Sequence, residues 1–235
     1  MDVRFINEQT IMIYFENKIS EETYRNVTAM VRWIREKEIL EIQDIVPSYR
    51  AVLIYFDEQA ITPSKLIEKN VHAVNQTNRI IKIPVQYGGT YGPDIEEVAK
   101  HNRITVEQVI EKHTSKPYLI YMLGFMPGFP YLGGLDEQLH TPRRNQPRLK
   151  IHAGSVGIAN NQTGLYPSDS PGGWQIIGRT PLKVFSSERE PMSMYEAGDW
   201  IQFYAIDEQQ FIQIERDISD GKFNVDDWVV IENVN

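Results

Sequence analysis

The chain of 235 residues contains no cysteine. Disulfides, thiolate metal sites and cysteine nucleophiles are therefore excluded, and the composition fits a reducing compartment. The longest uninterrupted apolar runs, Ala51 to Phe56 and Tyr118 to Leu123, are far shorter than the roughly 20 residues of a membrane-spanning helix. The opening MDVRFINEQT lacks a basic segment followed by an apolar one, so we expect no signal peptide. We expect a cytoplasmic protein without membrane contact.

Standard catalytic and metal-binding motifs are missing as well. The sequence has no GxxxxGK[ST] loop for ATP phosphates, no HExxH segment and no paired CxxC. No two of the five histidines have a local spacing typical of metal ligands, so we expect no metal. His72, His101 and His113 fall in segments with helical periodicity, which favours structural roles. For His140 and His152, in a glycine-rich region, turn and pocket roles are both open.

The chain is acidic, with 32 Asp and Glu against 24 Lys and Arg and a net charge of −8. This balance argues against binding to nucleic acid or to an anionic membrane surface. The stretch from Tyr121 to Pro181 has the opposite balance, five basic against three acidic residues, which gives +2 and leaves −10 for the remainder. A basic stretch in an acidic chain indicates an anionic ligand, a carboxylate or a phosphate.

The same stretch holds ten of the fifteen glycines and seven of the thirteen prolines. Aromatic and branched apolar residues stand between them, unlike in disordered Gly/Pro tracts, which cannot bury enough apolar surface. Because glycine permits positive φ and proline fixes φ, we expect short strands joined by tight, rigid turns.

Periodicity predicts an α+β chain with two domains, residues 1–87 and 88–235. The first domain begins with a hairpin around Asn7-Glu8 and a helix capped by Ser20. A second helix starts at Thr62-Pro63, and a strand from Arg79 to Tyr87 returns to the sheet. Two helices that each cross between strands suggest a small α/β sandwich, for which a ferredoxin-like arrangement is one candidate.

The second domain begins at Gly88-Gly89 and Gly92-Pro93, residue pairs that interrupt helices and strands. Two short helices, at 94–101 and 105–113, precede a series of short strands. Many short strands with glycine turns and few helices indicate a closed or nearly closed β-barrel.

The segment from Ala153 to Gly157 comes close to the GxSxG nucleophile elbow around Ser155, but Ala153 replaces the first glycine. An elbow also needs a strand-to-helix turn, whereas strands are predicted on both sides. No hydrolase triad is assigned, and the catalytic residues stay unknown. Ser155 is either a hydrogen-bond donor to a ligand or a small residue in a tight strand.

Arg144 and Arg148 follow Thr141-Pro142. Arginine presents a planar fork that binds a carboxylate or phosphate through two hydrogen bonds, although a solvated basic turn explains them equally well. The segment from Ser168 to Trp174 is a second candidate, because its backbone N–H groups could form an anion-binding nest.

These residues belong to an expected substrate-binding set. Its members are Arg144, Arg148, Ser155, Gln162, Tyr166, Ser170, Gly172, Gly173 and Trp174. Six of them are expected to converge on one concavity: Arg144, Gln162, Tyr166, Ser170, Gly173 and Trp174.

Five segments resemble, in order, the signature of the bacterial Kip-inhibitor family: GFMPGFPYLGGLD, TPRR, AGSVGIA, QTGLYP and SPGGWQIIGRTP. The family is also described as the B subunit of the ATP-dependent 5-oxoprolinase, formerly allophanate hydrolase subunit 1, and is related to the carboxyltransferase part of urea carboxylase. The resemblance runs from about Ile83 to the end, with a weaker segment at Asp44 to Asp57. Ile151-His152 and Asn160 depart from the family pattern, which usually has Val-Pro and Gly there.

The resemblance implies an N-terminal α+β domain and a cyclophilin-like β-barrel. It implies a non-autonomous member of a complex that opens the cyclic amide 5-oxoproline to L-glutamate, together with an A subunit, and with a homologous C subunit that carries a related barrel. ATP is then needed by the complex and bound mainly outside this chain.

Two other functions remain open. Within the family, the alternative is a binding protein that inhibits a sensor histidine kinase. A peptidyl-prolyl isomerase follows from the cyclophilin-like shape alone, and a fold does not carry a function.

Overall fold

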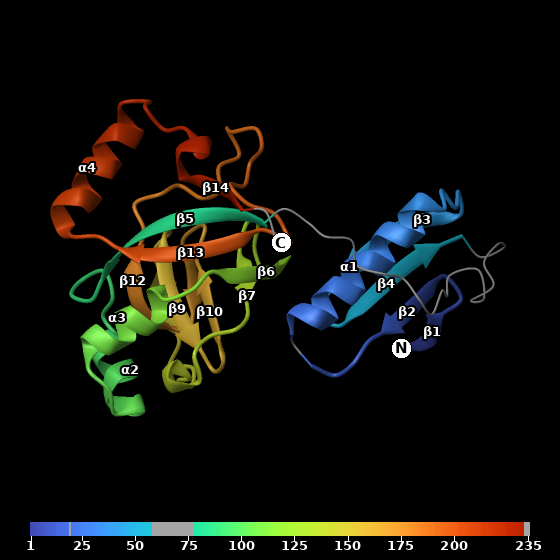
Figure 1. The fold of residues 1–235 in the computed structure, drawn as a ribbon, viewed down its shortest axis with the longest axis horizontal. Coiled ribbons are helices and arrows are strands. Elements are labelled where there is room, and N and C mark those ends of the chain that lie inside the picture. The colour runs from blue at the N-terminus through green and yellow to red at the C-terminus, as the bar shows by residue number, and fades with distance from the viewer. Residues whose placement is uncertain (19, 58–77, 233–235) are drawn as a thin grey trace. The chain divides into compact units, whose positions relative to one another are not determined.

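The computed structural model describes residues 1–18, 20–57 and 78–232 (Figure 1). The chain divides into two compact units, with the division between Gln76 and Thr77. Both contain sheets and helices, so the α+β class expected from the sequence is confirmed. Within the described ranges, no helix combines the length and apolar character that crossing a membrane requires.

The first unit is an antiparallel sheet with one described helix against it. Its strands are β1 (Asp2–Asn7), β2 (Thr10–Tyr14), β3 (Ile42–Pro47) and β4 (Ala51–Phe56), in the order β1-β2-β4-β3. The helix α1 (Glu21–Glu36) begins where predicted, since the Oγ atom of Ser20 accepts a hydrogen bond from the N–H of Thr23 at 3.2 Å. Val27 and Ile34 pack the helix onto buried residues of β2 and β4.

The strand from Arg79 to Tyr87, which the sequence predicts in the first domain, belongs to the second unit. β5 (Asn78–Tyr87) pairs with strands of the second unit, and the division between units lies before it rather than after it. Without this strand the described residues do not form the ferredoxin-like order. The helix expected after Thr62-Pro63, with His72, lies outside the described residues.

The second unit is a closed barrel. Its seven strands follow one another in the order β12-β9-β10-β7-β6-β13-β5, and β12 pairs with β5 to complete the ring. They are β5, β6 (Tyr118–Leu123), β7 (Pro130–Leu132), β9 (Ser155–Ala159), β10 (Gln162–Leu165), β12 (Gln175–Arg179) and β13 (Trp200–Ala205). β5 is long enough to pair with β14 (Val229–Glu232) along its first half and with β12 at its last residues. The barrel expected from glycine-punctuated short strands is therefore present.

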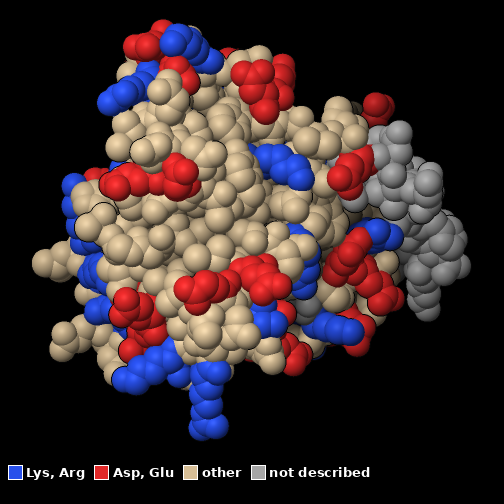
Figure 2. All heavy atoms as spheres, turned by 60° about the vertical axis from the view of Figure 1, so that its left-hand side comes forward, with Lys and Arg blue, Asp and Glu red and all other residues tan. Residues whose placement is uncertain are grey.

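Shorter elements surround the barrel. They are α2 (Ile95–Asn102), α3 (Val106–Thr114), α4 (Glu208–Ser219), two 3-10 turns (Glu137–Leu139 and Val225–Trp228), and the two-strand pair of β8 (Arg148–Ile151) and β11 (Ser170–Gly172). Thr105 and Gln108 form a capping box at the start of α3. On the face seen in Figure 2, acidic and basic side chains lie close together, so the charge of this face is mixed.

His113 lies fully buried in the barrel core. Its Nδ1 atom is 2.7 Å from the hydroxyl of Tyr87, and its Nε2 atom is 2.8 Å from Oγ1 of Thr163. Thr163 donates its own hydroxyl hydrogen to the carbonyl of Gly157, so His113 Nε2–H donates to Thr163 and Nδ1 accepts from Tyr87. Every polar atom of the ring is satisfied in the neutral form, and burial lowers the pKa of His113 to about 3.

Because His113 is buried in its neutral form, we expect the stability of the barrel to fall in acid. Below a pH of about 6.5 the unfolded chain gains a proton on His113 that the folded state takes up only near pH 3, so stability is lost as the pH falls. We expect this group to lower the free energy of unfolding by about 3 kcal/mol between pH 7 and pH 4. Urea unfolding of the barrel, followed across this range, should show a shallower pH dependence for His113→Gln.

His152→Gln is the matched control, because the His152 side chain is 61% exposed. The same pH dependence for His113→Gln and the unmodified chain would contradict this account. An NMR titration of the unmodified protein gives an independent check, in which the His113 ring should stay neutral at pH 5.

Candidate functional site

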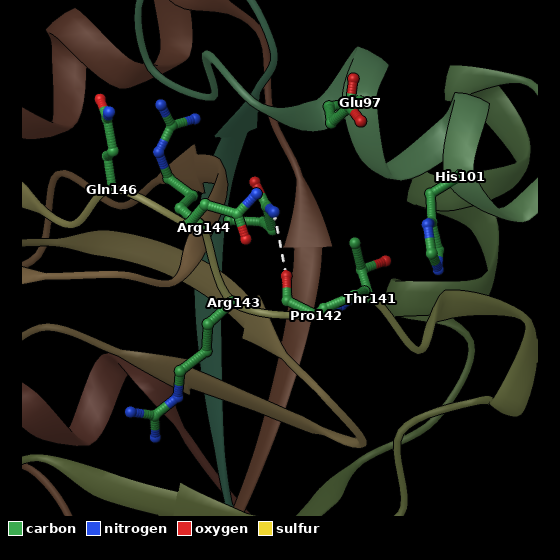
Figure 3. A pocket seen from close by; sticks show the side chains of 9 residues that line it. Glu97, His101, Thr141, Pro142, Arg143, Arg144 and Gln146 are labelled. Atoms are coloured by element: carbon green, nitrogen blue, oxygen red, sulfur yellow. Dashed lines mark hydrogen bonds between the residues drawn. The ribbon is translucent and has the colours of Figure 1, made fainter.

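A hollow of about 510 Å³ lies between α2 and the loop that precedes β8 (Figure 3). Its lining is polar: Glu97, His101, Thr141, Pro142, Arg143, Arg144, Asn145, Gln146 and Gln175. Glu97 and His101 are one helical turn apart on α2, which places both on the side of the helix that faces the loop. His101, for which the sequence favoured a structural role, thus lines this pocket.

Arg143 and Arg144 are neighbours in the loop, but their side chains point in different directions (Figure 3). The Arg144 side chain lies beside Gln146, whereas that of Arg143 points away from Glu97 and His101. Arg143 lies near Tyr166 instead: burial raises the pKa of Tyr166 to about 12, and the charge of Arg143 opposes this shift. Both arginines line the hollow, and Arg144 is the one whose side chain lies beside Gln146 in its wall.

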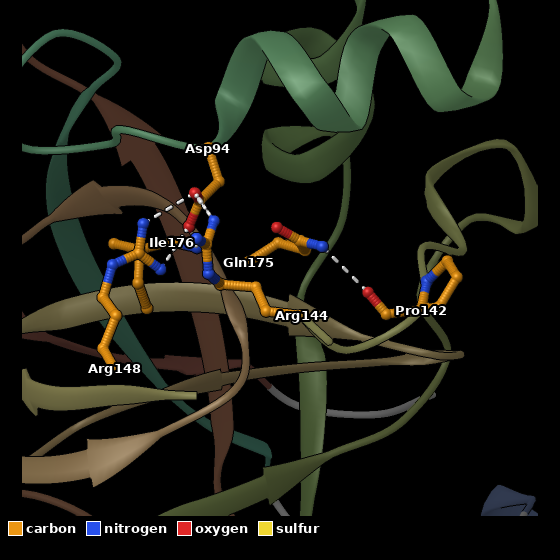
Figure 4. A network of polar contacts seen from close by, with 6 residues as sticks. All are labelled: Asp94, Pro142, Arg144, Arg148, Gln175 and Ile176. Carbon is orange, nitrogen blue, oxygen red and sulfur yellow. Dashed lines mark hydrogen bonds and ion pairs between the residues drawn. The ribbon is translucent and has the colours of Figure 1, made fainter. Parts of the chain in front are cut away.

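Asp94, the residue directly before α2, holds this wall in place (Figure 4). Its carboxylate is 4% exposed and accepts four hydrogen bonds. Oδ1 accepts from Arg144 Nη1 at 2.7 Å and Arg148 Nη2 at 2.7 Å, while Oδ2 accepts from Arg148 Nη1 at 2.8 Å and the Ile176 N–H at 2.7 Å. A buried carboxylate is tolerated only with such partners, so Asp94 ties α2, β12 and the arginine loop together.

The two arginines use Asp94 differently. Arg148 binds it through both terminal nitrogens, in a fork-to-fork pair. Arg144 binds it through Nη1 alone, and its Nη2 forms no hydrogen bond with any residue in the described ranges. The Arg144 side chain is 35% exposed, and its backbone N–H donates to the carbonyl of Gly173 at 2.7 Å. Two guanidinium charges against one carboxylate leave the cluster one positive charge in excess.

Two buried polar atoms of the pocket wall have no partner among the described residues: Arg144 Nε and Gln175 Oε1. Gln175 is 7% exposed, and its Nε2 donates to the carbonyl of Pro142 at 3.0 Å, which fixes the orientation of the amide. An unpaired buried donor or acceptor costs about 1–3 kcal/mol. These two atoms give one wall a donor and an acceptor that a polar ligand can use.

Three members of the expected set lie in an apolar cluster behind this region. Tyr166 and Trp174 are buried, and both pack edge-to-face on Phe129 with ring centroids 5.3 and 5.6 Å apart. A Cβ atom on Gly172 would come within 2.7 Å of the Tyr166 hydroxyl, so a larger residue there would have to displace the Tyr166 side chain. These three residues lie close together, and none of them lines the hollow described above.

The remaining members are spread along the strands. Ser155 is buried in β9, where its carbonyl accepts from the Tyr166 N–H at 2.9 Å. Gln162 begins β10 opposite Ala159, and Ser170 begins β11 opposite Ile151. Among the nine expected residues, the structure thus brings Arg144, Arg148 and Gly173 together, and Arg144 is the member that lines the pocket. His140 and His152 are not among the residues that line it.

Sequence reasoning missed Asp94, Gln175 and the role of Glu97. Asp94 was recognised only as the start of a helix after Gly92-Pro93. Its position at that start was the available signal, since an acid there is favoured by the helix dipole. Its partners lie 50, 54 and 82 residues further along the chain, and no local pattern indicates such contacts.

Comparisons with known proteins agree on one family. Residues 1–195 match the family described as "Carboxyltransferase domain, subdomain C and D". The chain is 38% identical over 234 residues to the B subunit of the 5-oxoprolinase of Bacillus subtilis (strain 168), covering 90% of this chain and 97% of that protein. It is 36% identical over 208 residues to the protein of the same name from Haemophilus influenzae, covering 86% and 97%.

Solved structures show the same fold. A conserved uncharacterized protein from Pyrococcus horikoshii has 39% sequence identity and a TM-score of 0.55, covering 89% of this chain and 100% of that one. The Kluyveromyces lactis urea carboxylase matches 99% of this chain and 24% of its own, with a TM-score of 0.75 and 20% identity. This second likeness is one of fold alone.

The Asp94 network predicts an order of stabilities. Arg148→Ala removes two charge-assisted hydrogen bonds and should lower the free energy of unfolding of the barrel by about 2 kcal/mol. Arg144→Ala removes one and should lower it by about 1 kcal/mol. Arg143→Ala, whose side chain takes no part in the network, should stay within about 0.5 kcal/mol of the unmodified chain. Urea denaturation of the variants measures these differences, and equal values for Arg148→Ala and Arg143→Ala would refute the order.

Proposed function

Because this chain belongs to the family of carboxyltransferase domains, subdomains C and D, we propose that it acts as the B subunit of a 5-oxoprolinase complex. One observation carries the proposal: the 38% identity with the Bacillus subtilis protein extends over 97% of that protein. Chains this similar over nearly their whole lengths share their domains, whereas a likeness of fold alone does not indicate a function.

The proposed reaction is the ATP-dependent opening of 5-oxoproline to L-glutamate. Hydrolysis of this five-membered lactam breaks its C–N bond and adds water, so a neutral amide becomes a carboxylate and an amine. Amide hydrolysis passes through a tetrahedral oxyanion, which fixed hydrogen-bond donors stabilise. Substrate, intermediate and product are all anionic, and the positive charge in excess at Asp94, Arg144 and Arg148 supports a binding role for this pocket.

The proposal divides the work between the proteins of the complex. The sequence carries no phosphate-binding loop, and Ser155 lies in a β-strand rather than in a nucleophile elbow. We therefore assign ATP binding and the bond-breaking groups to the partners, which are the A subunit of the complex and its C subunit with a related barrel. This chain contributes binding and orientation, which accelerate a reaction by holding the reacting groups in place.

Reconstitution tests this division. The purified chain should release no glutamate from 5-oxo-L-proline and ATP, and activity should appear only when both partner proteins have been added. Glutamate is measured by an enzyme-coupled assay, with mixtures that each lack one of the three proteins as controls. Release by the lone chain at the rate of the full complex would contradict the proposal, as would a full complex without activity.

A further inference from the structure

The guanidinium of Arg144 has one edge occupied and one edge open. Asp94 takes Nη1, so Nε and Nη2, which share the opposite edge, remain. Nε is buried and has no partner, and Nη2 makes no hydrogen bond within the described ranges. An edge of two parallel N–H groups matches the two oxygens of one carboxylate, and this is the geometry in which arginine binds carboxylates most specifically.

Gln175 adds an acceptor to the same pocket. Its Nε2 donates to the carbonyl of Pro142. A flip of the amide would exchange the positions of Nε2 and Oε1 and lose this bond, so the atom that faces the ligand is the acceptor Oε1. Oε1 is buried in the wall and has no hydrogen-bond partner among the residues that the structure describes. A ligand that completes this wall therefore offers a carboxylate to Arg144 and an N–H group to Gln175.

We propose that the pocket binds the carboxylate of a cyclic α-amino acid derivative on the Nε–Nη2 edge of Arg144, and that Gln175 Oε1 accepts the neighbouring N–H. The choice of 5-oxoproline as this ligand rests on the function proposed above. In 5-oxoproline the ring N–H and the carboxylate are attached to the same carbon, so the two protein groups meet adjacent groups of one molecule. Nε and Oε1 are covered in this structure, and binding therefore includes a small displacement of the pocket wall.

Asp94 is a positioning residue in this arrangement. By holding Nη1 it orients the guanidinium and leaves a single edge for the ligand. Arg148 donates from both terminal nitrogens to the two carboxylate oxygens of Asp94, so this pair of donors is committed to Asp94. The structure thus separates two arginines that the sequence treats alike: Arg144 binds the ligand, and Arg148 supports Asp94.

Three small probes separate the two contacts. The first is 5-oxo-L-proline, the second is 2-pyrrolidone, which lacks the carboxylate, and the third is 5-oxotetrahydrofuran-2-carboxylate, in which oxygen replaces the N–H. Calorimetric titration without ATP is carried out on the full-length chain and on the assembled complex. In at least one of these two preparations, 5-oxo-L-proline should bind more tightly than either analogue.

The variants then assign each contact. Arg144→Ala should weaken both carboxylate probes by roughly 10- to 150-fold and leave 2-pyrrolidone unchanged. Arg144→Lys keeps a positive charge beside Asp94 but lacks the two parallel N–H groups, so its affinity for the carboxylate probes should lie between those of Arg144→Ala and the unmodified chain. Binding at this intermediate affinity shows that the loss in Arg144→Ala is not caused by unfolding. Gln175→Leu should abolish the preference for the lactam over the lactone. Arg216→Ala is the control, because this exposed arginine of α4 does not line the pocket, and its affinities should stay within about threefold of those of the unmodified chain.

Several results would overturn the proposal: equal affinities for Arg144→Ala and Arg216→Ala, no preference for the probe with both groups, or no binding to either preparation. The turnover assay keeps this question apart from the proposed function. Binding that depends on Arg144 in a complex without turnover would reject the function and keep the site. Normal turnover and affinity with Arg144→Ala would reject the site and keep the function.

Discussion

The buried carboxylate of Asp94 is the interaction on which the pocket depends. It joins the start of α2, the first residues of β12 and the arginine loop, three segments that are far apart in the sequence. Burial of this carboxylate without its four donors would be strongly unfavourable. The arginine nitrogens that bind Asp94 therefore stabilise the fold and also set the geometry of the site. The shape of the pocket follows from the hydrogen bonds that this one carboxylate requires.

Local features of the fold could be predicted from the sequence because their causes are local. Ser20 and Thr105 cap their helices through residues three positions away, and glycine-rich turns between short apolar runs led to the barrel. The return of β5 was assigned to the wrong unit, because its partners β13 and β14 lie more than a hundred residues away. Pairing over such distances depends on the whole chain rather than on any single segment.

The site was predicted only in part, for the same reason. The basic loop identified Arg144 and Arg148 as candidates, but their different roles follow from Asp94, which no spacing connects to them. Aromatic residues were ambiguous in another way: Tyr166 and Trp174 suit a pocket wall and an apolar core equally well, and packing against Phe129 decided between them. The type of a residue indicates which interactions its side chain can make, whereas its neighbours in the fold determine which of these interactions remain available to a ligand.

The position of β5 in the barrel has a consequence for the order of folding. β5 is the first strand of the ring, yet it pairs in parallel with β13, so that Ile80 lies opposite Trp200. Ring closure thus joins residues 120 positions apart, and contacts of such high sequence separation form slowly because a long loop must be ordered first. During synthesis β5 is made long before β13 leaves the ribosome, and the edge of β5 that pairs with β13 stays open until then. A chain that ends before residue 200 leaves that edge exposed, which favours association with other chains.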